Sequence, residues 1–381
     1  MIRTLKAFSA ASALALTLAS PALAQTQDFA PQGWTAKSLP EIAAGIASGD
    51  TSAEAVVEAY LNRIEAIDRQ GPTLRSVISI NPDALEEARA VDAAIAAGAA
   101  VGPLAGVPIL LKDNIESREL PTTAGALALA ENDKGRDSPL VAGLREAGAI
   151  ILGKTNLSQW ANYRSEDSIS GWSALGGQVK NPHMLDRSPC GSSSGSGAAM
   201  AASLAAGTVG TETNGSIICP SNVNGIVGFK PTVGLVSQQY IVPISSSQDT
   251  AGPMTKTVTG AALMLTAMAT GEGAVDYVTA LDAEALDGAK IGVLRFTQGS
   301  NKDIQALFTT ALKDLEAAGA ELVEIPSFEN TLQAAPSDAP NLLAVEFKHT
   351  LGAYHAEAAD AVPVITVEDV IAFKEAHAEI V

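Results

Sequence analysis

The sequence has 381 residues, 47% of them hydrophobic, which is enough for one large α/β domain or two medium ones with a substantial core. Its 42 acidic and 24 basic residues give a formal net charge of −18 at pH 7, which argues against nucleic acid and anionic membrane surfaces as partners. The four histidines lack the spacing of metal ligands, so no metal site is expected.

The first 24 residues have the pattern of a signal peptide. Arg3 and Lys6 precede an apolar run, and Ala22–Ala24 fits the small-x-small rule for a cleavage site. The apolar run is shorter than the roughly 20 residues that a membrane span needs, which disfavours a membrane anchor. We therefore predict cleavage after about Ala24, export to the periplasm or the cell exterior, and a mature domain of residues 25–381 that does not enter the membrane.

The first part of the mature chain predicts scaffold helices. Capping boxes begin at Ser38 and Thr51, and after the second box apolar residues recur at helical spacing as far as Ile67. A β-like run over 76–80 precedes a third helix over 83–97.

From Gly106 onward, short apolar runs alternate with helices, the pattern of a largely parallel sheet with crossover helices. Strands are expected at 107–111, 149–152, 290–296 and 321–325, and helices at 138–147 and 303–318. We expect one sheet, covered on both faces, to contain all of these strands. A final helix begins at Thr366 and continues to Val381 without a stop signal.

Residues 165–260 have a different composition, because Gly, Ser, Asn and Pro are dense and signals for helices or strands are few. Such a stretch predicts a poor core but suitable loops for a functional site. Its only histidine is His183, in an Asn-Pro-His-Met turn, which argues against a histidine base here.

Three features in or near this stretch have chemical potential. Residues 190–197 read CGSSSGSG and open a small-residue helix, but they lack the lysine of a P-loop and the third glycine of a dinucleotide fingerprint, which disfavours nucleotide binding. Residues 210–217 read GTETNGSI, a turn that brings several backbone N–H groups close to the hydroxyl of Ser216, as an oxyanion requires.

The third feature is Lys112, at the end of an apolar strand. Burial would lower the pKa of this lysine from about 10.4 toward the values of about 7–8 that suit a general base. The alternative is a structural ion pair, for example with Asp113. If the protein is a serine hydrolase, a lysine rather than a histidine is expected to be its base.

In chain order, the three features resemble the amidase signature family. That family combines a G-V-P…K-D strand end, a G-G-S-S-G-G-S loop and a D-x-G-G-S nucleophile loop, which here read GVPILLKDN, CGSSSGS and ETNGS. The stretches GKTN, GIVGFKPT and DTAGP also look like family motifs, and the resemblance runs from about Leu39 to the last residue. The chain departs from the family pattern at four positions, none of them a catalytic side chain: Cys190, Ser194, Glu212 and Asn214.

The resemblance implies a fold and a set of catalytic residues. The fold is a single large α/β domain whose mixed, mostly parallel twisted sheet has helices on both faces. Ser216 would be the nucleophile, and Ser192 would relay its proton to a neutral Lys112. In the family the residue that matches Ser192 follows a cis peptide bond, which implies one between Gly191 and Ser192.

The resemblance also implies the surroundings of these residues. Ser193 would help to orient the network, and neither a metal nor an organic cofactor is required. Main-chain N–H groups of four residues would form the oxyanion hole: Thr213, Asn214, Gly215 and Ser216.

The implied activity is hydrolysis of a carboxamide to a carboxylic acid and ammonia through an acyl-serine. The loop motifs look most like those of secreted bacterial peptide amidases, so the substrate is expected to be a small-molecule or peptide amide, for example the C-terminal amide of a peptide. One alternative is the transamidating subunit that acts on charged tRNA, which the signal peptide and the acidic charge disfavour. The other alternative is a non-catalytic or inactive amidase-like binding protein.

Two further points stay open at the level of sequence. Family members usually continue well beyond the position of Val381, so we expect a C-terminally truncated chain that is poorly soluble or inactive, whereas a longer version would hydrolyse amides. Cys190 and Cys219 flank the two serines and are able either to form a disulfide in an oxidising compartment or to stay as two small buried thiols. The sequence does not predict the oligomeric state.

Overall fold

The protein is represented by a computed structural model that describes residues 29–327 and 341–379. The predicted signal peptide lies outside the described residues. The chain divides into one unit that ends at Ala30 and a second unit of Pro31–Val381, and the fold below is that of the second unit. Among the described helices, none has both the length and the apolar character needed to span a membrane.

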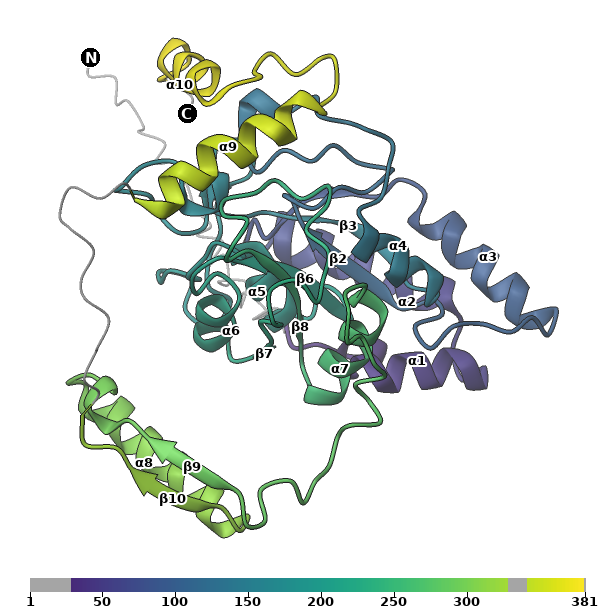
Figure 1. The fold of residues 1–381 in the computed structure, drawn as a ribbon. Coiled ribbons are helices and arrows are strands. Elements are labelled where there is room, and N and C mark those ends of the chain that lie inside the picture. The colour runs from purple at the N-terminus through teal and green to yellow at the C-terminus, as the bar shows by residue number, and fades with distance from the viewer. Residues whose placement is uncertain (1–28, 328–340, 380–381) are drawn as a thin grey trace, which may run out of the picture. The chain divides into compact units, whose positions relative to one another are not determined.

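A six-stranded sheet forms the centre of this unit (Figure 1). Its strands are β1 (Val77–Ile80), β2 (Pro108–Lys112), β3 (Ile150–Thr155), β6 (Gly207–Glu212), β7 (Val227–Gly228) and β8 (Thr250–Thr255). The strand order is β1-β3-β2-β6-β8-β7. The three central strands β3, β2 and β6 pair in parallel, whereas β1, β8 and β7 each pair antiparallel with their neighbours. Four of these six strands therefore run in one direction, and the predicted mixed, mostly parallel α/β fold is confirmed.

Helices cover both faces of the sheet, as the contacts of two glycines in β6 show. A Cβ on Gly207 would collide with Met264 of α7 (Val258–Met268) and touch Leu39 of α1 (Leu39–Ser48). A Cβ on Gly210 would instead meet Ser193, next to α5 (Ser194–Ala201), and Ile217, next to α6 (Ile218–Asn224). Residues three apart in a strand point to opposite faces, so α1 and α7 cover one face and α5 and α6 cover the other.

The expectation that residues 165–260 make a poor core is wrong for residues 191–217 and for β8, whereas most of 165–190 and 222–240 is exposed or half-buried. The strands β6 and β8 and the helix α5 are buried along nearly their whole length. The stretch packs because its residues are small: a Cβ on Gly195 would collide with the backbone oxygens of Asn156 and Ser76. Small side chains let the loop of residues 190–193 (the serine loop), α5 and the sheet approach one another closely.

The N-terminal helices follow the sequence with one correction. Glu41 accepts the N–H of Ser38 at 2.8 Å, so the first capping box forms at the start of α1. The second helix, α2 (Ala53–Arg63), is capped by Ser52 rather than Thr51, because the Ser52 hydroxyl accepts the N–H of Ala55. A π-helical segment, Ile64–Arg69, follows α2. The third and fourth helices are α3 (Ala84–Ala96) and α4 (Pro139–Glu146).

The expectation that one sheet contains every strand is also wrong. The strands β9 (Lys290–Val293) and β10 (Glu321–Glu324) pair in parallel with each other in a separate two-stranded sheet, connected by α8 (Lys302–Ala317). Most residues of these two strands are exposed or half-buried. Strands with so much polar and exposed surface do not suit a sheet that is covered on both faces. Another small sheet consists of β4 (Trp172–Ser173) and β5 (Gly177–Gln178).

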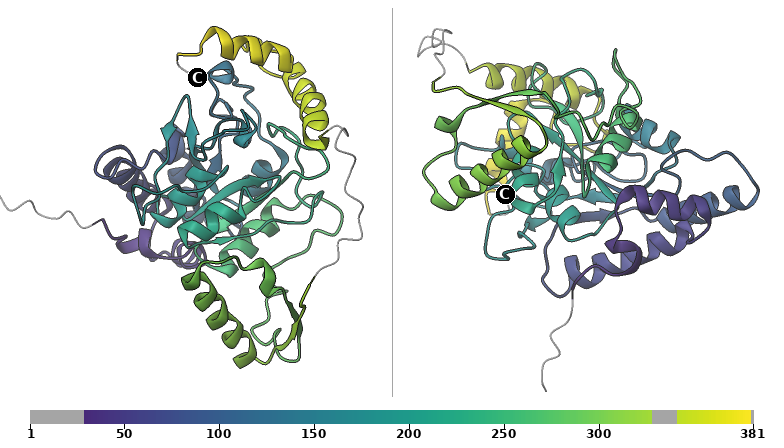
Figure 2. Two further views of the ribbon diagram at one scale, coloured as in Figure 1. Left: turned by 90° about the vertical axis from the view of Figure 1, so that its left-hand side faces the viewer. Right: turned by 90° about the horizontal axis from the view of Figure 1, so that it is seen from below.

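The last helices are α9 (Leu342–Ala356) and α10 (Val367–Ala376), drawn in yellow in Figures 1 and 2. Thr366 caps α10 as predicted, but the helix ends at Ala376 and not at Val381, which lies outside the described residues. Leu351 and Val364 pack in one apolar cluster with Trp160, and Asn132 donates a hydrogen bond of 3.0 Å to Tyr354. These contacts join α9 to the loops around the central sheet.

Candidate active site

Strand β2 places Lys112 at its carboxyl end, where the side chain is 0% exposed. The Nζ atom lies 2.8 Å from Ser192 Oγ, 2.8 Å from Thr211 Oγ1 and 3.1 Å from the Thr211 carbonyl oxygen. Burial lowers the pKa of Lys112 to about 7, and the negative charges of Asp249 and Glu212 partly oppose this effect. Lys112 is therefore able to lose its proton near neutral pH.

The structural ion pair considered for Lys112 is made by another lysine. Asp113 lies 3.6 Å from the Nζ of Lys154, in the GKTN stretch. Lys154 also donates to the Ile115 carbonyl oxygen at 2.6 Å and to Thr122 Oγ1 at 2.9 Å. Within the described part of the chain, Lys112 has no carboxylate within ion-pair distance. The two neighbouring lysines therefore have different partners.

Ser192 lies in the serine loop, and its hydroxyl accepts the hydrogen bond from Lys112. The Gly191–Ser192 peptide bond is cis, as the family resemblance implies. The Ser192 carbonyl oxygen accepts the N–H of Ser158 at 3.0 Å. A Cβ on Gly191 would collide with Ser158 Oγ and approach Ser194 Oγ to 2.8 Å, so the loop has space only for glycine at this position.

Ser216 follows the end of β6 in a tight turn in which Gly215 has a φ of +83°. The Ser193 N–H donates to the Ser216 carbonyl oxygen at 3.1 Å, which connects the two serine-bearing loops. The Ser193 hydroxyl accepts the N–H of Thr211 at 3.2 Å and donates to the Thr211 carbonyl oxygen at 3.1 Å. The structure thus brings Lys112 and Ser192 into direct contact and links Ser216 to them through Ser193. Among the described hydrogen bonds, none joins the hydroxyls of Ser192 and Ser216.

The Glu212 carboxylate organises the turn around Ser216. It accepts the N–H groups of Gly215 at 2.8 Å, Ile217 at 2.7 Å and Ile218 at 2.9 Å. The Gly215 N–H, which the sequence assigned to the oxyanion hole, is therefore engaged by Glu212. The N–H groups of Thr213, Asn214 and Ser216 donate no hydrogen bond within the described structure.

Comparison with known proteins identifies the family. The model of the amidase family matches residues 55–377. The chain belongs to the amidase family. An amidase-family protein of Arthroderma benhamiae is 42% identical over 302 residues, which are 75% of this chain and 50% of that protein. A glutamyl-tRNA(Gln) amidotransferase subunit of Acidothermus cellulolyticus is 42% identical over 324 residues, 80% of this chain and 62% of that protein.

A solved structure is similar over most of this amidase-family chain. The X-ray structure of the peptide amidase from Stenotrophomonas maltophilia has 44% sequence identity and a TM-score of 0.81, and the match covers 90% of this chain and 72% of that chain. This chain thus spans 50% and 62% of the lengths of the two relatives above and a larger share of the peptide amidase.

Three residues that contact the site in this family member were missed by the sequence analysis. Thr211 contacts Lys112 through both its hydroxyl and its carbonyl oxygen. Lys230 donates to the Thr213 carbonyl oxygen at 2.6 Å, and Asp249 accepts the Thr213 hydroxyl. Lys230 and Asp249 belong to the GIVGFKPT and DTAGP stretches, so those motifs carried a signal for them. His183 bonds to the Asn224 carbonyl oxygen at 2.9 Å, which is a structural contact.

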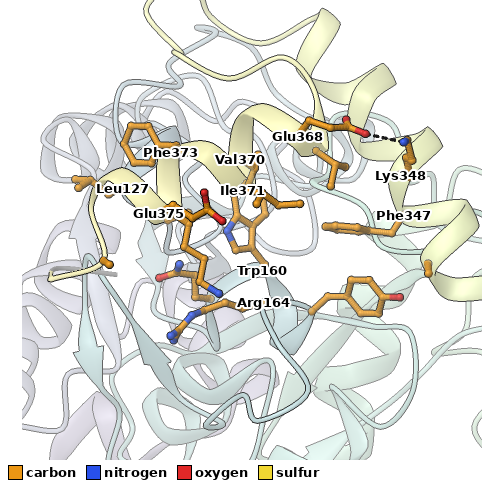
Figure 3. A pocket seen from close by; sticks show the side chains of 18 residues that line it. Leu127, Trp160, Arg164, Phe347, Lys348, Glu368, Val370, Ile371, Phe373 and Glu375 are labelled. Carbon is orange, nitrogen blue, oxygen red and sulfur yellow. Dashed lines mark hydrogen bonds and ion pairs between the residues drawn. The ribbon is translucent and has the colours of Figure 1, made fainter.

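An apolar cavity of about 670 Å³ lies between the loops around Trp160 and the helices α9 and α10 (Figure 3). Trp160, Phe347 and Phe373 supply aromatic walls, and charged side chains of both signs, among them Arg164 and Glu375, also line the cavity. The next residue, Ala161, lines a much smaller cavity together with Ser192. Consecutive residues of one loop therefore border the candidate catalytic site and the apolar cavity.

The two cysteines form a disulfide with a Cα–Cα distance of 5.9 Å. This finding decides between the two alternatives that the sequence left open. The bridge joins the serine loop to the start of α6.

Proposed function

We propose that this chain hydrolyses a carboxamide C–N bond through an acyl-enzyme on Ser216. The proposal depends on one observation above all: the buried Lys112 Nζ lies 2.8 Å from Ser192 Oγ and has hydroxyl and carbonyl partners instead of a carboxylate. A lysine in such surroundings is able to be neutral near pH 7 and to act as a general base.

In the proposed reaction, Ser216 Oγ attacks the amide carbonyl carbon. Its proton passes to Ser192 Oγ, which gives its own proton to the neutral Lys112 Nζ. When the tetrahedral intermediate collapses, the C–N bond breaks and the proton returns along the same path to the departing ammonia. Water then attacks the acyl-serine by the same relay and releases the carboxylic acid.

The oxyanion of the intermediate requires preorganised N–H donors. The N–H groups of Thr213, Asn214 and Ser216 are not engaged within the described structure, which supports their role as the oxyanion hole. The Gly215 N–H donates to Glu212, so we assign this residue to shaping the turn rather than to binding the oxyanion.

We propose a C-terminal peptide amide as the substrate. The similarity to the Stenotrophomonas maltophilia peptide amidase supports this class. The cavity beside Trp160 adds a second argument, because its aromatic and aliphatic walls suit an apolar side chain of the peptide. Phe347 on α9 and Phe373 on α10 would contact that side chain.

Similarity to the amidotransferase subunit gives the main competing candidate, which is transfer of ammonia to charged tRNA. The net charge of −18 disfavours a site next to polyanionic RNA. The signal-peptide pattern supports export instead, and a disulfide is typical of an oxidising compartment. N-terminal sequencing of the protein recovered from the producing cells tests export, and a start near Gln25 is expected.

Ammonia release from peptide amides, aliphatic amides and aryl amides tests the proposed activity. The proposed function predicts turnover of peptide amides by this chain, contrary to the expectation of an inactive short chain, and no turnover by Ser216→Ala. After rapid acid quenching, mass spectrometry should find the acyl group on the peptide that contains Ser216. Retained activity in Ser216→Ala would overturn the mechanism, and transfer of ammonia to charged tRNA without release would favour the competing candidate.

A further inference from the structure

The Cys190–Cys219 disulfide connects the two loops that carry the candidate catalytic serines. Cys190 lies two residues before Ser192, and Cys219 lies three residues after Ser216. The disulfide is thus a covalent link between the two loops, close in sequence to both serines. Within the described contacts, it touches neither hydroxyl.

Each end of the bridge is tied to the backbone that places a serine. Cys190 has a φ of +57°, a left-handed conformation that favours glycine, and glycine is the residue that the family pattern has there. Cys190 therefore has a backbone conformation that is unfavourable for a residue with a side chain, and its side chain forms the bridge from this position. At the other end, the Cys219 N–H donates to the Gly215 carbonyl oxygen at 2.8 Å, so Cys219 is fixed to the turn that holds Ser216.

Other contacts between the two loops are single hydrogen bonds. The Ser193 N–H donates to the Ser216 carbonyl oxygen at 3.1 Å, and Asn224 Nδ2 of α6 donates to the Pro189 carbonyl oxygen at 3.0 Å. The hydroxyls of Ser192 and Ser216 must exchange a proton in the proposed reaction, yet they share no hydrogen bond in the described structure. Their separation therefore depends on how firmly the two loops are held together.

We propose that the Cys190–Cys219 disulfide is a positioning device that sets the separation of Ser192 and Ser216, so that its reduction slows proton transfer between them. The inference rests on the proposed function and adds a redox dependence to it. Reduction by dithiothreitol breaks the S–S bond and leaves two thiols, while the reagent is oxidised to its own cyclic disulfide.

This role predicts a particular pattern of kinetic change. The surroundings of Lys112 come from β2, Ser192 and Thr211 and from the charges of Asp249 and Glu212, none of which the bridge includes. Breaking the bridge should therefore leave the midpoint of the pH–kcat profile unchanged. It should lower the maximal kcat that the profile reaches on its alkaline side. We expect kcat to fall about tenfold or more with little change in KM, since small misplacements of reacting groups cost up to about 10²-fold.

The test compares the oxidised 381-residue chain with Cys190→Gly/Cys219→Ser, in which glycine keeps the backbone conformation and no free thiol remains. The readouts are kcat and KM on a peptide amide against pH, and the rate at which a small fluorophosphonate modifies Ser216, followed by mass spectrometry. Circular dichroism and thermal unfolding define the fraction of folded molecules, and all rates are expressed per folded molecule. Reduction and reoxidation of the wild-type chain give the same comparison without a substitution.

Two results together would support the inference. Ser216 is modified more slowly without the bridge, and the maximal kcat is lower while the pH midpoint of the profile is unchanged. Reoxidation of the reduced wild-type chain should reverse both changes. Equal rates per folded molecule, with a change in thermal stability alone, would overturn it and leave the proposed function intact. A wild-type chain whose Ser216 reacts no faster with the fluorophosphonate than ordinary serines would overturn the proposed function, and the inference with it.

Discussion

Two lysines are buried on neighbouring strands of the central sheet, and their surroundings differ. Lys154 in β3 lies 3.6 Å from the Asp113 carboxylate and donates to the Ile115 carbonyl oxygen and the Thr122 hydroxyl. Lys112 at the end of β2 has two hydroxyls and one carbonyl oxygen as partners. Burial lowers the pKa of both lysines, and nearby negative charges oppose this effect in each. At Lys154 that charge belongs to its ion-pair partner Asp113, whereas at Lys112 it comes from Asp249 and Glu212, which are not within ion-pair distance.

The comparison teaches that burial alone does not mark a catalytic lysine. A carboxylate partner neutralises the charge of Lys154 and makes the pair structural. Hydroxyl partners are able to donate as well as accept, so they tolerate a neutral Lys112 and connect it to Ser192. The kind of partner decides the role of each lysine.

The largest effect is expected from Lys112→Ala. Without a base at the end of the relay, kcat for amide hydrolysis should fall at least about 10³-fold. KM should change little, because Lys112 is buried behind Ser192. Steady-state kinetics on a peptide amide checks this, and a loss of less than tenfold in folded protein would remove Lys112 from the mechanism.

Lys154→Met should act on stability instead. It leaves the Asp113 carboxylate buried without its cation, which typically costs about 3–5 kcal/mol in the free energy of unfolding. Urea unfolding measures this loss, and kcat per folded molecule should stay within a few-fold of the wild type. A loss of kcat as deep as that of Lys112→Ala, with unchanged stability, would show that the distinction between the two lysines is wrong.

Glu212→Gln should have an intermediate effect with a signature in the pH profile. The Glu212 charge raises the pKa of Lys112, so its removal should lower that pKa and move the midpoint of activity to lower pH. The turn also loses a charged acceptor for the Ile217 and Ile218 N–H groups, and kcat should fall about tenfold, equal to about 1.4 kcal/mol. A midpoint that moves to higher pH would contradict the assignment of the titrating group to Lys112.

The smallest effect is expected at the apolar cavity, which neither lysine lines. Phe347→Ala removes an aromatic wall on α9 and should lower kcat/KM for peptide amides with bulky apolar side chains by up to about tenfold. Acetamide, which has no such side chain, should be hydrolysed at an unchanged rate. Val345→Ala, an exposed position on the same helix that does not line the cavity, is the matched control. Equal losses for both variants would argue against the cavity as a binding site.

The sequence predicted the parts of the site that local motifs carry. The order of Lys112, Ser192 and Ser216 indicated the family, and the central strands followed from apolar runs with turn signals. The contact of Thr211 with Lys112 could not be predicted in this way, because it depends on β2 pairing in parallel with β6 across about a hundred residues of chain.

Other differences have equally local causes. Residues 191–217 pack into the core because glycine, alanine and serine allow close approach, a property that hydrophobic patterning does not register. The pairing of β9 with β10 alone was missed because a β-α-β pattern does not specify which sheet its strands join. The engagement of the Gly215 N–H by Glu212 requires the folded turn and left no signal in the sequence.

The pH dependence of kcat/KM on a peptide amide tests the central claim most directly. Lys112 must be neutral to accept a proton, so it is active above its pKa of about 7 and inactive below it. The profile should therefore show a plateau on the alkaline side and fall about tenfold per pH unit below a single midpoint near 7. A rate that is independent of pH between about 5 and 9, or one that rises as the pH falls through 7, would contradict a neutral Lys112 as the base.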